Sequence, residues 1–248
     1  INAGVDAHNI AIGYNAGLSI STAVRNTLVG NFAGDALTTG LYNVAIGYGA
    51  LSAEDAHGRN VAIGFSALAA QNAGADAYNI AIGYNAGLNV STGANNILVG
   101  GVAGDALTTG SDNIAVGRGA LSAEDAHGRN IAIGRDTLNV QDAGADAYNI
   151  AIGYYAGKAV TTGVENTFIG GLAADALTIG NYNVALGYKA LSTSVDGDNN
   201  TAIGYKALED YEDGDGNGHN TAVGANSQLN ATTGEFNTSL GSGSMGTG

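Results

Sequence analysis

The 248-residue chain contains 41 glycines, no proline, no cysteine and no tryptophan, and its 22 acidic and 8 basic side chains give a net charge of −14. The absence of cysteine excludes disulfides and thiolate chemistry, and the negative charge argues against nucleic acid or an anionic membrane as partner. No apolar run approaches the roughly 18 residues needed to cross a bilayer, so we expect no membrane insertion in this segment.

A five-residue pattern of asparagine, any residue, a small residue, an aliphatic residue and glycine recurs along the whole chain. The pattern first occurs as "NIAIG" at residues 9–13, and its copies follow at intervals of 17 residues, with a longer interval of 19 or 20 after every fourth copy. The fourteen asparagines are Asn9, Asn26, Asn43, Asn60, Asn79, Asn96, Asn113, Asn130, Asn149, Asn166, Asn183, Asn200, Asn220 and Asn237.

This repeat predicts an all-β protein. A short fixed period is typical of solenoids, and the alternation of large and small residues in "NIAIG" is the period of a β-strand. We therefore expect a parallel β-solenoid, a β-roll or β-helix, of about 14 rungs of 17–20 residues. Leucines such as Leu37 and Leu51 are expected to come from a second strand in each rung.

Two columns of the repeat predict specific stacking. Asparagines in register can form a ladder of side-chain hydrogen bonds from rung to rung, and we assign all fourteen this structural role. A glycine closes every motif, as Gly13 and Gly30 do, which indicates a positive φ angle or close backbone approach.

The alternation also separates two faces of each strand. We expect Ile10 and Ile12 to point into the coil, and Ala11 and Gly13 to form the opposite face. A core this thin buries little area. Chains are therefore expected to associate through the alanine and glycine face as a homotrimer.

Four rungs form a super-repeat, so the chain reads as one repetitive region with super-repeats near 1–70, 71–140 and 141–211 and a partial one at 212–248. The sequence begins without methionine, its first residues lack the basic and apolar pattern of a signal peptide, and it starts and ends within the repeat. We expect it to be a fragment of a longer chain.

The first and second super-repeats each contain the turn "AEDAHGRN", which places His57 beside Asp55 and His127 beside Asp125. A carboxylate and a histidine can perform acid–base chemistry. A repeated surface turn is the favoured interpretation, and no enzyme activity is expected.

The partial super-repeat opens with the acidic turn "EDGDGNG". Asp213, Asp215 and Asn217 place oxygen atoms at alternate positions, as the start of a calcium-binding loop does. The twelfth position of such a loop would be Gly224 instead of glutamate. Ca²⁺ is the one cofactor considered for this chain, and an acidic turn that fills the 20-residue rung is the alternative.

Aromatic residues often follow the motif glycine. Rings aligned along a solenoid can stack against the faces of sugars, or they can form a structural ladder over the edge of the coil. The tyrosines considered for glycan stacking are Tyr14, Tyr48, Tyr84, Tyr154, Tyr188 and Tyr205.

The motifs "NVAIG", "NTAIGYKAL" and "NVALGYKAL" resemble two related groups. One is the head of trimeric autotransporter adhesins, a left-handed parallel β-roll, and the other is the repeat of marine bacteriophage tail fibres. The resemblance spans Asn9 to Gly241, although adhesin-head coils usually run nearer fourteen residues. It implies an extracellular structural or adhesive protein on a virion or a bacterial surface. Its partners would be copies of itself and a host glycan or receptor.

Two other classes of function stay open from the sequence. A self-assembling extracellular filament would grow by pairing of chain ends. A glycan-binding β-helix module would use the aligned tyrosines.

Overall fold

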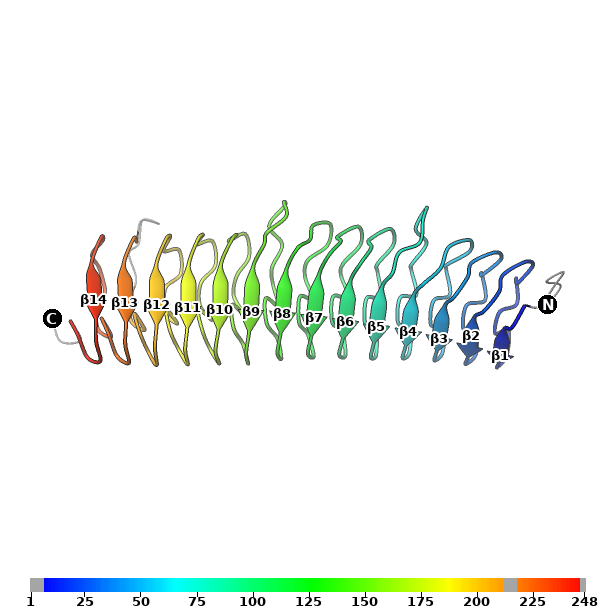
Figure 1. Ribbon diagram of the computed structural model, residues 1–248, viewed down its shortest axis with the longest axis horizontal. Helices are drawn as coiled ribbons and strands as arrows, with labels where there is room; N and C mark the ends of the chain where they lie inside the picture. The colour runs from blue at the N-terminus through cyan, green and yellow to red at the C-terminus, as the bar shows by residue number, and fades with distance from the viewer. Residues whose placement is uncertain (1–6, 212–217, 246–248) are drawn as a thin grey trace. The chain divides into compact units, whose positions relative to one another are not determined.

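The computed structural model describes residues 7–211 and 218–245, and every regular element within them is a β-strand (Figure 1). The chain divides into two compact units, Ile1–Gly128 and Arg129–Gly248. The first unit contains β1 (Ile10–Ile12), β2 (Thr27–Val29), β3 (Val44–Ile46), β4 (Val61–Ile63), β5 (Ile80–Ile82), β6 (Ile97–Val99) and β7 (Ile114–Val116). The second contains β8 (Ile131–Ile133), β9 (Ile150–Ile152), β10 (Thr167–Ile169), β11 (Val184–Leu186), β12 (Thr201–Ile203), β13 (Thr221–Val223) and β14 (Thr238–Leu240). The described residues include no helix that is long and apolar enough to cross a membrane.

Within each unit, consecutive strands pair in parallel and in the register of the repeat. Ile10 lies opposite Thr27, and each later strand of the first unit pairs in the same way. The strands of the second unit follow the same rule. Each repeat therefore forms one coil, and the predicted parallel β-solenoid is confirmed.

The part of each coil outside the strand is made of turns, so the expected second strand is wrong. Many residues there adopt left-handed backbone angles, for example Leu51 with φ of 52° and Leu68 with φ of 49°, and these angles interrupt an extended strand. Neighbouring turns are nevertheless hydrogen-bonded, because the Gly17 amide donates to the Ala33 carbonyl at 3.0 Å. The 19-residue coil after β4 forms a longer loop than its neighbours (Figure 1).

The fourteen motif asparagines lie one per coil, just before each strand. In both units the Oδ1 atom accepts a hydrogen bond from the backbone amide of the next asparagine, at 2.8–3.1 Å. In many coils the Nδ2 group also donates to a carbonyl 14 residues further along, as Asn96 does to Gly110. The side chains thus satisfy backbone groups inside the coil, where water does not reach them.

The motif glycines occupy a position that other residues cannot adopt without strain. Gly83 has φ of +143°, and a Cβ atom there would overlap the carbonyl group of Gly100 in the next coil. The strands consequently end at a residue without a side chain.

The inner and outer faces of the strands are the reverse of our expectation. The middle residue of each strand points into the coil, and Ala45, Ala62 and Ala81 are fully buried. The first and third residues point outward, so that Ile46 and Ile82 are 37% and 38% exposed. We call these outward residues the outer strand face. The homotrimer interface predicted on the alanine and glycine side is therefore wrong, because that side fills the coil interior.

Bulky and small residues exchange places inside the coil. Leu98 replaces alanine in the middle of β6, and a Cβ atom at Gly87 or Gly104 would lie 2.7 or 2.8 Å from its methyl groups. In the next coil the middle residue is Ala115, and leucine stands at position 121, which is equivalent to Gly104. The interior thus holds only a few large side chains per coil, such as Leu98 and Leu107 in the coil of β6 and Leu121 in that of β7.

Candidate functional site

Five aromatic rings of the first unit form a continuous column. Neighbouring centroids are 5.3–5.6 Å apart, first edge to face and then stacked. The side chains remain partly open to solvent, and Tyr14 and Tyr84 are 66% and 58% exposed. The rings are those of Tyr14, Phe32, Tyr48, Phe65 and Tyr84.

The next coil of the first unit interrupts this column. Gly101 follows the motif glycine there, and a Cβ atom on it would meet no other atom within 4 Å. The side of the Tyr84 ring that faces this coil is therefore not covered by an aromatic neighbour. Phe32 was missed from the sequence because it stands one position later in its coil than the tyrosines do.

In the second unit the three tyrosines predicted for glycan stacking lie in two separate pairs, one of which includes Tyr155. Tyr154 stacks on Tyr155 with centroids 3.9 Å apart, and the Arg135 guanidinium lies 5.8 Å from each ring centre. The hydrogen bond with Tyr155 raises the pKa of Tyr154. Tyr188 stacks on Tyr205 at 5.8 Å. Whether these rings bind sugars stays a prediction.

A second column stands one residue before each asparagine, and from Arg25 to Tyr78 it alternates arginine and tyrosine. The Arg25 guanidinium lies 5.4 Å from the Tyr42 ring centre, and that of Arg59 lies 5.8 Å from Tyr42 and 5.4 Å from Tyr78. Arg59 also forms a salt bridge with Asp76. The guanidinium groups of Arg25 and Arg59 therefore interact with neighbouring side chains of the same unit.

In the second unit, the Glu209 carboxylate forms ion pairs with two lysines. Lys206 and Lys189 lie 2.8 and 3.2 Å from its carboxylate oxygens. Burial opposes ionisation of Glu209, but the hydrogen bonds and charges of the two lysines outweigh it and lower the pKa of this carboxyl. The cluster is an ion-pair network that supports the fold.

The "AEDAHGRN" turn is only partly the surface turn expected from the sequence. Asp55 is exposed and His57 half-buried, but Glu54 is fully buried. One Glu54 oxygen, Oε1, accepts the His57 backbone amide at 2.9 Å and lies 3.9 Å from His57 Nδ1. Burial raises the pKa of Glu54, although the His57 amide and imidazole oppose this.

The second copy of the turn has the same arrangement. Glu124 is fully buried, and its Oε1 atom accepts the His127 backbone amide at 3.2 Å and lies 3.8 Å from His127 Nδ1. In each copy the glutamate and the aspartate each offer one carboxylate oxygen and the histidine offers one ring nitrogen. These three atoms lie within 4.8 Å of one another. Aligning the coils on their asparagines would have predicted that both glutamates are buried. They stand eleven residues after the asparagine, where Leu37 and Leu107 stand in other coils.

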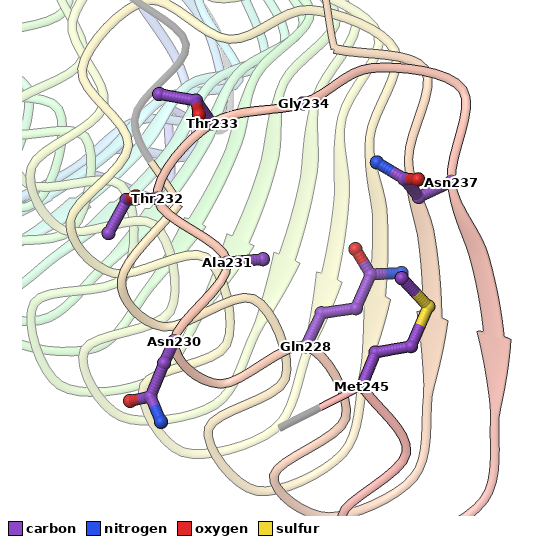
Figure 2. A pocket seen from close by; sticks show the side chains of 8 residues that line it. All are labelled: Gln228, Asn230, Ala231, Thr232, Thr233, Gly234, Asn237 and Met245. Atoms are coloured by element: carbon purple, nitrogen blue, oxygen red, sulfur yellow. The ribbon is translucent and has the colours of Figure 1, made fainter. Parts of the chain in front are cut away.

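An open hollow of about 580 Å³ lies at the last coils of the second unit (Figure 2). Its lining is polar and contains no ionisable side chain, and Figure 2 shows Gln228, Asn237 and Met245 pointing into one space. In earlier coils of the unit the equivalent surface is covered by the next coil. The lining residues are Gln228, Asn230, Ala231, Thr232, Thr233, Gly234, Asn237 and Met245.

The calcium turn considered at Asp213, Asp215 and Asn217 lies outside the described residues. Comparison with protein families, with curated proteins and with solved structures finds no match. The β-solenoid fold is compatible with structural or fibre-like proteins, and the candidate sites are the aromatic column and the two acidic turns.

Proposed function

We propose that this chain is a structural segment of an extracellular surface fibre, the shaft or head of a phage tail fibre or of a bacterial adhesin. In this role it catalyses no reaction. Copies associate side by side as a trimer and display a host-binding surface.

The outer strand face is the observation that carries this proposal. In the first unit thirteen of its fourteen residues are isoleucine or valine and the other is Thr27, so none of the chain's 22 acids stands on it. Ile10, Ile12 and Ile97 are 51%, 61% and 38% exposed. Contiguous exposed apolar surface marks an interaction site, and copies of one chain would cover it with the same kind of surface.

The orientation of the strands also supports association between copies. The interior of each coil is filled by alanine and a few larger residues, which bury little apolar area, while the isoleucines and valines of the strands point outward. Burying these outer residues between copies would supply hydrophobic stabilisation that a single chain lacks.

The mass of the chain in solution tests the proposal. We expect sedimentation of the wild-type chain to give three times the 24.5 kDa of one chain. The Ile82→Lys/Ile97→Lys variant should sediment as a monomer, because lysine cannot be buried without a partner. Leu18→Lys is the matched control, since Leu18 is 65% exposed but stands outside the outer strand face, and it should keep the wild-type mass.

A wild-type chain that stays monomeric at high concentration contradicts the proposal, as does an unchanged mass in the double lysine variant. Particles that lengthen steadily with concentration would instead support a self-assembling filament.

A glycan-binding module is the second candidate, and the exposed tyrosine rings favour it. Tyr84 and Tyr154 are 58% and 48% exposed, and sugars stack on aromatic faces of this kind. Binding on a glycan array that is lost in Tyr84→Ala or Tyr154→Ala would support this function. Equal binding by both variants and the wild type would count against it.

A further inference from the structure

The segment "LSAEDAHGRN" occurs twice without change, at residues 51–60 and 121–130. Its glutamate takes a coil position that holds Leu37, Val90 or Leu107 in other coils of the first unit. The one other buried polar residue at this position in the first unit, Gln71, is hydrogen-bonded to Asn79 and Ser91. Glutamate is almost never fully buried without a partner. A carboxylate at this position therefore needs a specific explanation.

Several polar atoms of the first copy are buried without a hydrogen-bond partner. They are Glu54 Oε2, His57 Nδ1 and Asn60 Nδ2. Buried polar groups in folded proteins are normally paired, and an unpaired one costs about 1–3 kcal/mol. The Asn60 amide group is a hydrogen-bond donor, but Glu54 Oε2 and His57 Nδ1 can both donate an electron pair. Two such atoms in one turn indicate a missing partner.

No basic side chain of the same segment fills this need. Arg59 is engaged by Asp76 and by the Tyr78 hydroxyl at 3.0 Å. Within the turn, the His57 imidazole lies beside Glu54, with its Nδ1 atom 3.9 Å from Glu54 Oε1. The negative charge of the turn is therefore not balanced by arginine or lysine.

Glu54 and His57 belong to a group of residues that could hold a metal ion. Glu54 and Asp55 each offer a carboxylate oxygen and His57 a ring nitrogen, all within 4.8 Å of one another. Ligand atoms around one Zn²⁺ ion lie about 3–4 Å apart, given bond lengths of about 2.0–2.2 Å. Because Asp55 is exposed and His57 half-buried, small side-chain rotations bring them to this spacing.

We propose that the turn formed by Glu54, Asp55 and His57 binds one divalent transition-metal ion, and that the turn of Glu124, Asp125 and His127 binds a second. One imidazole nitrogen and two carboxylate oxygens are a donor set that suits Zn²⁺ and its first-row neighbours. Ca²⁺ prefers six to eight oxygen ligands, so the histidine disfavours it. Water completes the coordination on the side of Asp55.

Calorimetric titration of the full chain with Zn²⁺, after treatment with EDTA, tests this proposal. We expect two ions per chain for the wild type and one for His57→Gln. For His57→Gln/His127→Gln, affinity should fall at least about tenfold, since even weaker perturbations of metal sites have effects of this size. The chain has four histidines, so His8→Gln/His219→Gln is the matched control and should still bind two ions.

Further measurements separate loss of a ligand from loss of folding. Asp55→Asn/Asp125→Asn changes exposed groups of the turns and should also weaken Zn²⁺ binding, with an unchanged circular dichroism spectrum in EDTA. Zn²⁺ should raise the unfolding temperature of the wild type, because a ligand of the folded state stabilises it. The same concentration of Ca²⁺ should not.

Three results would overturn the proposal. The first is the absence of saturable Zn²⁺ uptake by the wild-type chain. The second is full uptake by both the double glutamine variant of His57 and His127 and the double asparagine variant of Asp55 and Asp125. The third is Ca²⁺ binding as strong as that of Zn²⁺.

Discussion

Replacing Asn79 and Asn60 separately by alanine tests how the asparagines hold the coils together. The two side chains are fully buried and stand in neighbouring coils at the starts of β5 and β4. The Nδ2 group of Asn79 donates to Gln71 Oε1 and to the Gly93 carbonyl, both at 2.7 Å, and its Oδ1 atom accepts the Asn96 amide at 2.8 Å.

Asn60 makes fewer of these bonds. Its Oδ1 atom accepts the Asn79 amide at 3.0 Å, but its Nδ2 group has no partner. Asn60 begins a 19-residue coil. Its two additional residues change the course of the segment whose carbonyl group accepts the Nδ2 hydrogen bond in other coils. The two alanine variants therefore remove equal volumes but different numbers of hydrogen bonds.

The expected costs follow from the number of buried groups left without a partner. Asn79→Ala leaves three and Asn60→Ala leaves one. At about 1–2 kcal/mol for each group, Asn79→Ala should cost roughly 3–6 kcal/mol and Asn60→Ala roughly 1–2 kcal/mol. Hydrogen exchange of the amides in the first unit, together with guanidinium unfolding, measures both free energies. Equal costs, or a larger cost for Asn60→Ala, would refute this assignment of hydrogen bonds.

Further predictions concern packing, backbone and charge. Leu98→Ala should cost about 3 kcal/mol in unfolding free energy, and Gly104→Leu in the same chain should recover about half, measured in guanidinium. Gly83→Ala should cost at least about 2 kcal/mol in the same assay, because it combines strain with overlap in the next coil. Since the folded-state pKa of Glu209 is lowered, its contribution is present above its unfolded pKa and is lost as pH falls below 4.5. The unfolding temperature of Glu209→Gln should therefore change less than that of the wild type as the pH falls below 4.5.

The sequence is sufficient to predict the solenoid, because one asparagine and one glycine per 17 residues demand equivalent places in stacked coils. It is not sufficient to tell which side of the strand faces inward. Alternation establishes only that Ile80 and Ile82 point away from Ala81. The expectation that larger residues lie inside fails here because buried leucines from the turns, such as Leu51 and Leu68, fill the coil beside an alanine in the middle of the strand.

The acidic turns illustrate a different limit. Read along the chain, "AEDAHGRN" is a polar loop, and its histidine and second acid are indeed at the surface. When the coils are aligned with one another, its first acid, Glu54, occupies the same buried position as Leu37 and Gln71. The comparison across coils identifies Glu54 as unusual, but only coordinates show that one of its oxygens has no partner.

The inner residues of each strand determine the stability of the coils, and in the proposed fibre the outer residues determine whether copies of the chain associate. Coils are joined by short-range hydrogen bonds and by a narrow core, so a change such as Leu98→Ala acts within the unit that contains it. Outer residues such as Ile82 contribute little to that core, because their side chains are partly in solvent. Inner substitutions should therefore increase local hydrogen exchange without changing the mass of the assembly. Outer substitutions should change the mass and leave exchange within the isolated chain unaffected, and a fibre built in this way can alter its surface without losing its coils.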